Sequence, residues 1–207
     1  MLNKNTNLVL NPTNLEEERM PVVDLHIIEG YNSDEKRRLG EAITDAIRFV
    51  IPAPSELVTV MVLDLPTENY YRGRTTRIPA PAKADPSKVV QDYLGAMEAR
   101  DLAKAQSYLG EGFKMCFPGT AAMTSLQELI DWAKPRYNFV TKTYDGFDAL
   151  QSPEDAAIVY CRGTLSGEWP DGTAFKDIRF IDRFEIVNGK LRRQDVWNDI
   201  AETKADT

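Results

Sequence analysis

The sequence predicts an α+β protein made of two units, and three observations support this. Residues 21–77 show a strand–helix–strand pattern, residues 78–86 are rich in proline, and residues 87–207 place helices before four long strands. A proline-rich stretch cannot continue a helix or a central strand, so 78–86 is expected to be an extended linker. Helices followed by a run of strands are typical of a sheet with helices on one face.

The composition excludes several classes of function. The chain has 207 residues, of which 43% are hydrophobic and 28% charged, and its formal net charge is −7. Basic residues are scattered, which argues against a nucleic-acid partner, and no apolar segment is long enough to span a membrane. With two cysteines and a short apolar run in the N-terminal extension 1–20, we expect a cytoplasmic protein without a disulfide framework. The sequence has one histidine and no CxxC, HExxH or P-loop pattern, so we expect no metal or organic cofactor.

The first unit is predicted to be a βαβ unit. Val23, Leu25 and Ile27 alternate with polar residues, as in a strand. Asn32 and Glu35 have the spacing of a capping box at the start of a helix. A second strand is expected over 57–65, apolar on both faces as a buried parallel strand would be. One helix and two strands cannot cover both faces of their sheet, so we expect this unit to assemble with other copies.

The second unit is predicted to be a curved antiparallel sheet over three helices. The stretch "PSKVVQDYLGAMEARDLAKAQSYLG" contains two helices and "SLQELIDWAK" contains a third. Turn signals such as "WPDG" and "NGK" separate the strands. These strands are expected near 138–150, 156–168, 173–187 and 190–199.

One carboxyl group is predicted to lie in an apolar environment. Within the strand 173–187 the even positions from 178 to 186 are apolar except for Asp182, whereas the odd positions from 177 to 185 are mostly charged. Alternation therefore places Asp182 in the middle of the apolar face. A buried carboxylate is costly, so it must find a partner or stay protonated. A protonated aspartic acid donates a hydrogen bond, which can stabilise a developing enolate.

The first unit resembles the four-oxalocrotonate tautomerase family. The matching stretches are Pro21 with "HIIEG", then "SDEK", "APSELVTVMV" and "PTENYYRG". The resemblance implies that Pro21 is the general base and that Tyr70 covers the pocket. Tyr31 and Thr59 occupy positions where carboxylate-binding arginines are expected, and Arg72 and Arg74 are candidate replacements.

Pro21 has two possible roles. As numbered it lies inside the chain, where its nitrogen is an amide and has no basicity, whereas a free α-amino group titrates near pH 8. If translation starts at Met20 and this methionine is removed, Pro21 gains the free amine. If the extension is retained, the unit is an assembly scaffold.

The second unit resembles the SnoaL-like branch of the nuclear transport factor two (NTF2) fold, which includes ketosteroid isomerases and polyketide cyclases. The matching motifs are "VVQDYLGAMEARDL", "GTLSGEWPDGTAF" and "IRFIDRFEIVNGKLRRQDVWND". The resemblance implies a cone-shaped domain in which Tyr93 and Asp182 donate hydrogen bonds to a carbonyl oxygen. Phe117 stands where the family has its proton-abstracting aspartate, so Asp195 or Asp199 would have to replace that base. The ligand-binding candidates are Phe117, Phe180, Phe184 and Trp197.

These features predict an isomerase or cyclase-type enzyme that acts on a small hydrophobic carbonyl compound through an enol or enolate. We expect a homo-oligomer, dimeric through the cone domain and of higher order through the tautomerase-like unit. The alternative is a non-catalytic ligand-binding or assembly protein whose two units have both lost their bases, which the amide of Pro21 and the side chain of Phe117 favour.

Overall fold

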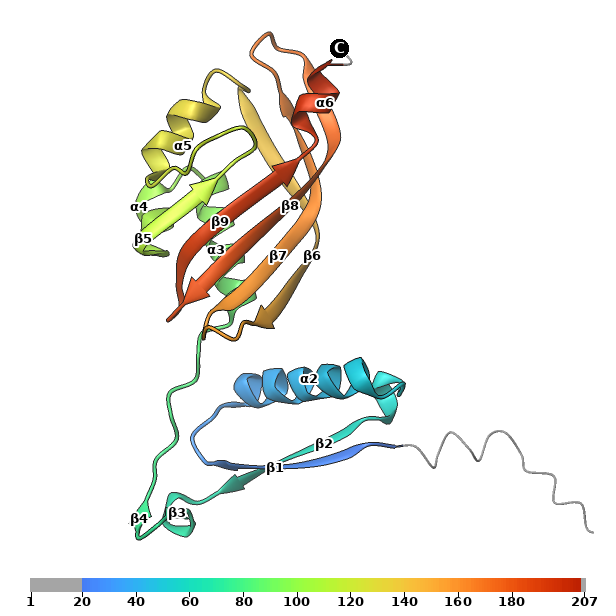
Figure 1. Ribbon diagram of the computed structural model, residues 1–207, viewed down its shortest axis with the longest axis vertical. Coiled ribbons are helices and arrows are strands. Elements are labelled where there is room, and N and C mark those ends of the chain that lie inside the picture. Colours follow the sequence, from blue (N-terminus) through green and yellow to red (C-terminus); the bar gives the residue numbers. More distant parts are fainter. Residues whose placement is uncertain (1–19, 206–207) are drawn as a thin grey trace, which may run out of the picture. The chain divides into compact units, whose positions relative to one another are not determined.

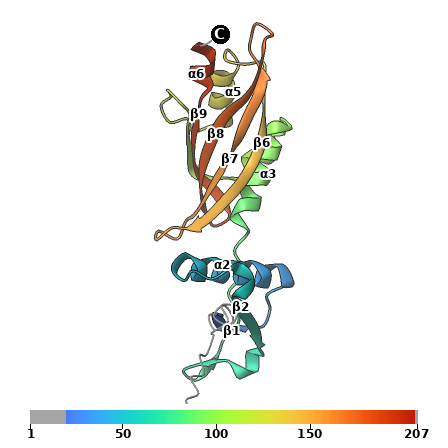
Figure 2. The same cartoon turned by 90° about the vertical axis from the view of Figure 1, so that its right-hand side faces the viewer.

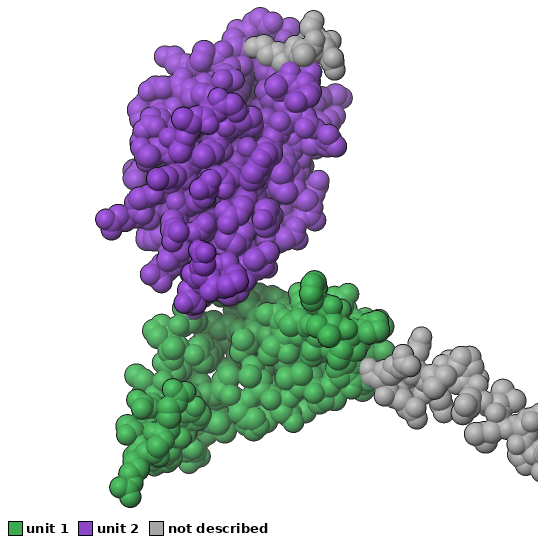
Figure 3. Space-filling view, viewed as in Figure 1, with its two compact units in different colours: residues 1–82 green, residues 83–207 purple. Residues whose placement is uncertain are grey.

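The chain divides into two compact units. The computed structural model describes residues 20–205, and the units comprise residues 1–82 and 83–207 (Figure 3). None of the helices in the described range is long and apolar enough to cross a membrane.

Unit 1 is the predicted βαβ unit (Figure 1). Strands β1 (Val22–Ile28) and β2 (Thr59–Leu65) pair in parallel and are connected through helix α2 (Ser33–Val50). The predicted capping box is confirmed. The side chain of Asn32 accepts hydrogen bonds from the backbone N–H groups of α2, and the Glu35 carboxylate accepts one from the Asn32 N–H at 2.7 Å. These bonds satisfy N–H groups that have no partner inside the helix.

The two-stranded sheet of unit 1 has one open face. Alternate residues of β1 and β2 are half-buried, and those between them are exposed. Met61 and Leu63, on the exposed positions of β2, are 42% and 45% exposed. No residue from 20 to 82 is buried, so a single copy of unit 1 has no core of its own.

Within unit 1, the chain after β2 contains the short elements η2 (Thr67–Asn69), β3 (Tyr71–Arg72) and β4 (Thr75–Thr76), and η1 (Ser55–Leu57) lies just before β2. Tyr31, at the start of the α2 segment, donates a hydrogen bond from its hydroxyl to the carbonyl of Ala80 at 2.8 Å. This bond holds the residues after the β3–β4 hairpin close to the beginning of α2.

Unit 2 is a five-stranded sheet with helices on one side (Figures 1 and 2). The strand order is β5-β9-β8-β7-β6. The strands are β5 (Leu109–Cys116), β6 (Phe139–Gln151), β7 (Ala157–Glu168), β8 (Ala174–Val187) and β9 (Lys190–Asn198). The helices are α3 (Pro86–Glu98), α4 (Leu102–Ser107), α5 (Leu126–Ala133) and α6 (Ile200–Ala205).

The sheet of unit 2 is mixed rather than antiparallel as expected. Strands β6 to β9 pair in antiparallel fashion, but the edge strand β5 runs parallel to β9. Parallel neighbours need a long connection, and here α5 and the strands β6 to β8 lie between β5 and β9 in the sequence.

The core of unit 2 lies between the inner face of the sheet and the helices. The predicted alternation of β8 is confirmed, since Ile178, Phe180, Asp182, Phe184 and Ile186 are all buried. Tyr93 of α3 is 1% exposed, and its ring meets that of Phe184 at a centroid distance of 6.1 Å. Burying one large apolar side chain contributes about 1.5–3 kcal/mol, so this layer accounts for much of the stability of unit 2.

Two glycines of β7, Gly163 and Gly167, lie where the long strands bend. Pairing shifts between Tyr144 and Gly146 on β6, and between Leu165 and Gly167 on β7. A Cβ atom at Gly163 would lie 1.9 Å from the carbonyl oxygen of Thr143, and one at Gly167 would lie 2.2 Å from that of Phe139. Bulges increase the local twist of a strand and bend it, so these glycines allow the curvature that opens a cavity on the inner face.

Candidate functional site

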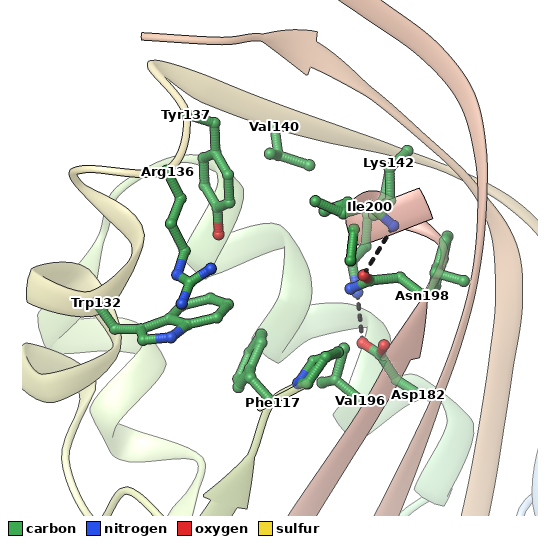
Figure 4. A pocket seen from close by; sticks show the side chains of 14 residues that line it. Phe117, Trp132, Arg136, Tyr137, Val140, Lys142, Asp182, Val196, Asn198 and Ile200 are labelled. Carbon is green, nitrogen blue, oxygen red and sulfur yellow. Dashed lines mark hydrogen bonds and ion pairs between the residues drawn. The ribbon is translucent and has the colours of Figure 1, made fainter. Parts of the chain in front are cut away.

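A cavity of about 430 Å³ lies on the inner face of the curved sheet (Figure 4). Its walls come from β6, β7, β8 and β9, from the segments around α5 and α6, and from the residues after β5. Most of the lining is apolar or aromatic, as in sites for small organic ligands. The polar exceptions are Arg136, Tyr137, Lys142, Asp182 and Asn198.

Asp182 is the only carboxyl group among the described residues that line this cavity. It is 0% exposed, and its Oδ2 atom is ion-paired with the ammonium group of Lys142. The Nε2 atom of Gln194 also donates to Oδ2, at 3.4 Å. The other oxygen, Oδ1, is buried and has no hydrogen-bond partner among residues 20–205. Burial raises the pKa of Asp182, while Lys142 and Gln194 act in the opposite direction.

Lys142 is the cation on this side of the cavity, and the sequence analysis missed it. Its side chain is 21% exposed, and its ammonium nitrogen lies 4.3 Å from the centroid of the Phe180 ring. On β6 it shares the half-buried positions with Val140 and Tyr144. That alternation was a signal in the sequence, because a lysine between two inward apolar residues must also point inward.

The opposite wall carries a second cation (Figure 4). The guanidinium carbon of Arg136 lies 4.3 Å from the centroid of the Trp132 ring, within the range of a cation–π contact. The ring of Phe117 packs against Trp132 at a centroid distance of 5.1 Å. The Nε1 donor of Trp132 is buried without a hydrogen-bond partner in the described part of the chain. The exposed guanidinium group of Arg136 therefore gives this wall a hydrogen-bond donor for an anionic or carbonyl oxygen.

Tyr93 does not form the expected pair with Asp182. Its hydroxyl donates to Oε1 of Gln194 at 3.4 Å, and Gln194 in turn donates to Asp182. Burial, together with the charge of Asp182, raises the pKa of Tyr93. Tyr93 does not line the cavity, so it supports Asp182 through Gln194 instead of converging with it on a ligand.

The structure of strand β9 contradicts two predictions, that Asp195 is a candidate base and that Trp197 contacts the ligand. Its register shifts opposite Glu185 and Ile186, which pair with Arg193 and Leu191, so one residue of β9 is left out of the pairing. Because of this extra residue, residues after Arg192 no longer share the face of Leu191 at every second position. Asp195 and Trp197 therefore lie on the outer face. Asp195 is ion-paired there with Arg193 at 2.8 Å and Arg183 at 3.4 Å, and Trp197 is 52% exposed.

The shifted register supplies different residues to the cavity. Val196 and Asn198 line it, and so do Ile200 and Ala201 of α6, in a segment for which no site was predicted. The predicted ligand-binding residues Phe117 and Phe180 also line the cavity. Phe184 does not, since it is fully buried beneath the cavity surface beside Tyr93.

The candidates in unit 1 do not form a comparable site. The carbonyl of Pro21 accepts a hydrogen bond from the Thr59 N–H at 2.9 Å, and its nitrogen is part of the peptide bond to Met20. Arg72 lies on the exposed strand β3, and Tyr70, just before it, is half-buried. The described residues contain no cluster of His, Cys, Asp or Glu side chains that could hold a metal ion.

The two units resemble different groups of known proteins. Residues 21–76 match the model of the tautomerase enzyme family. A probable tautomerase from Streptococcus mutans is 33% identical over 52 residues, which cover 25% of this chain and 85% of that protein. A probable tautomerase from Streptococcus agalactiae serotype III is 31% identical over 52 residues, covering 25% of this chain and 87% of that protein.

The second unit has a structural relative. The crystal structure of an NTF2-like protein of unknown function from Burkholderia pseudomallei superposes with a TM-score of 0.50 and 17% identity, covering 59% of this chain and 96% of the other. The α+β fold expected for the second unit is therefore that of the NTF2-like proteins. Through residues 21–76 the chain belongs to the tautomerase family, and an NTF2-like unit follows this domain.

Proposed function

We propose that the protein is an isomerase-type enzyme and that its unit 2 enolises a small, largely apolar carbonyl compound. The tautomerase family to which unit 1 belongs supports isomerase-type chemistry for the chain. For unit 2 the proposal is supported by the cavity itself, which combines apolar walls with one buried carboxyl group and two cations.

In the proposed reaction Asp182 is the base and Lys142 stabilises the enolate. The carbonyl oxygen of the ligand accepts a hydrogen bond from the Lys142 ammonium group, competing with Asp182 Oδ2. Oδ1 of Asp182 then removes a proton from the carbon next to the carbonyl. The electrons of the C–H bond form the carbon–carbon double bond, and the carbonyl π electrons move to the oxygen beside Lys142. Return of the proton to another carbon completes the isomerisation.

The observation that carries the proposal is the Oδ1 atom of Asp182, which has no hydrogen-bond partner among residues 20–205. A buried carboxylate oxygen without a hydrogen bond reduces stability, and burial raises the pKa of this group. Both effects make Asp182 a better proton acceptor than an exposed aspartate. Gln194 donates a hydrogen bond to the other oxygen of Asp182, Oδ2, and accepts one from the Tyr93 hydroxyl, so the two residues keep the carboxylate in place.

The proposal is tested by proton exchange in a simple ketone. The rate of deuterium incorporation next to the carbonyl of 2-tetralone is followed by NMR, with wild-type protein and with Asp182→Asn and Lys142→Met variants. Because a positioned base contributes a factor of about 100–10,000, we expect the catalysed rate to fall by at least about 100-fold in Asp182→Asn. Lys176→Met replaces an exposed lysine of β8 and is the matched control. Equal rates in all four proteins would contradict the proposal.

A non-catalytic ligand-binding protein is the second candidate. Two observations favour it: the Asp182 carboxyl is fully covered, and Phe117 stands where a base was expected. Binding of 2-naphthol, an unreactive enolate mimic, separates the two functions. If 2-naphthol binds in a Lys142-dependent manner while 2-tetralone exchanges no faster than in buffer, unit 2 is a binding module.

Unit 1 is proposed to drive assembly into a homo-oligomer through the open face of its sheet, because no residue from 20 to 82 is buried in one copy. A second, proline-dependent tautomerase site requires a chain that begins at Pro21. Intact-mass spectrometry of protein from the native host decides this, since retention of residues 1–20 excludes a basic Pro21.

A further inference from the structure

A second, smaller cavity of about 160 Å³ adjoins the first one in unit 2. The two cavities share four lining residues: Phe117, Tyr137, Val140 and Lys142. Both cavities therefore reach the same lysine side chain, and we call the four shared residues the partition. A ligand held by Lys142 can contact both spaces.

The lining of the second cavity is mainly apolar. Leu94 and Met97 come from α3, Leu129 and Ala133 from α5, and Tyr144 from β6. Besides Lys142, its charged lining residues are Glu98 and Arg100, which are exposed at and just beyond the end of α3, so this end of the cavity meets solvent. An apolar cavity of about 150 Å³ is large enough to bind benzene. The second cavity can accordingly hold one ring or a short alkyl chain.

We propose that the second cavity binds an apolar substituent of the ligand whose oxygen is held by Lys142, so that the protein selects elongated carbonyl compounds over compact ones. This rests on the proposed function in one respect, the placement of the ligand oxygen at Lys142. The four side chains common to both cavities support a single ligand that contacts both of them.

Phe117 and Tyr137 are the residues of the partition that determine specificity. Phe117 packs on Trp132 of the first cavity and also lines the second. Tyr137 lines both cavities, and burial raises the pKa of its phenol. The aromatic side chain at position 117 thus has a role in ligand selection, although it cannot act as a base.

The test uses a series of para-substituted phenols from phenol to 4-pentylphenol, with dissociation constants measured by calorimetry. Each methylene group that enters an apolar cavity should tighten binding about three- to fourfold. The measured quantity is the ratio of the constants for phenol and 4-pentylphenol within each protein. Met97→Trp fills the second cavity from α3 and should bring this ratio close to one. Gln91→Trp, at an exposed position of the same helix, is the control and should keep the wild-type ratio.

A second blocking variant, Ala133→Phe, fills the cavity from α5 and replaces Met97→Trp if thermal melting shows that the latter is unfolded. The inference is wrong if wild-type affinity does not rise with chain length, or if the length dependence survives in a folded blocking variant. Failure of phenol itself to bind, or binding that is unchanged in Lys142→Met, would instead contradict the proposed function.

Discussion

Asp182 loses its contact with water when unit 2 folds, and this gives its ionisation a predictable effect on stability. Burial raises the pKa of Asp182 above that of an exposed aspartate, which is about 3.9. A carboxyl group whose pKa is higher in the folded state stabilises the protein fully below the unfolded pKa. That contribution is lost as the pH rises through the folded pKa.

We therefore expect the free energy of unfolding of the wild type, relative to Asp182→Asn, to decrease as the pH rises from about 4 toward neutrality. Urea unfolding of both proteins at a series of pH values measures this difference. Lys142→Met removes the partner that opposes the shift, so the decrease should extend to higher pH in that background. A difference that stays constant over the whole range would show that Asp182 has an ordinary pKa.

Tyr93 offers a second test among single residues. Because its hydroxyl contacts Gln194 and not the cavity, Tyr93→Phe should leave the dissociation constant for 2-naphthol within about twofold of wild type. The loss of one buried hydrogen bond should lower stability by about 1 kcal/mol. Lys142→Met, which removes a charged donor, should weaken binding about tenfold or more. Equal losses of affinity in the two variants would show that Tyr93 contacts the ligand.

Among the elements, the bends of β6 and β7 depend on glycine. A side chain at Gly163 would collide with the backbone of Thr143, so Gly163→Ala should lower the free energy of unfolding by about 1–3 kcal/mol or more. Gly95→Ala is the matched control, because a Cβ atom there has no neighbour within 4 Å and lies in the interior of α3. It should raise stability by about 0.5–1 kcal/mol. Denaturant unfolding measures both, and similar changes in the two variants would contradict the steric argument.

The strands also show what the sequence could predict about the site. Strand β8 pairs with its neighbours without interruption around Asp182, so simple alternation placed that carboxyl group on the inner face. Alternation failed on β9, because the extra residue near Arg192 has no signature in the local sequence and arises from pairing with β8. The partner of Asp182 was missed for a related reason, since the contact with Lys142 joins strands 40 residues apart.

At the scale of the whole molecule, the open face of the unit 1 sheet makes a prediction about assembly. Leu63→Glu places a charge on an exposed apolar position of β2, and we expect it to lower the molecular mass of the full-length protein in solution. Ile78→Glu makes the same change in the stretch between β4 and α3, where Ile78 is 81% exposed, and should keep the wild-type mass. Analytical ultracentrifugation measures both, and an unchanged mass for Leu63→Glu would mean that this face is not an interface.

The two units also differ in where their folding free energy can come from. Unit 2 has its own buried core, whereas no residue of unit 1 between 20 and 82 is buried in a single copy. If neighbouring copies supply the missing contacts, mass action makes the melting of unit 1 depend on protein concentration, while unit 2 melts at the same temperature in dilute and concentrated samples. Dilution would then dissociate the oligomer while the core of each unit 2 stays intact, so the concentration of the protein would set its quaternary state separately from the folding of unit 2.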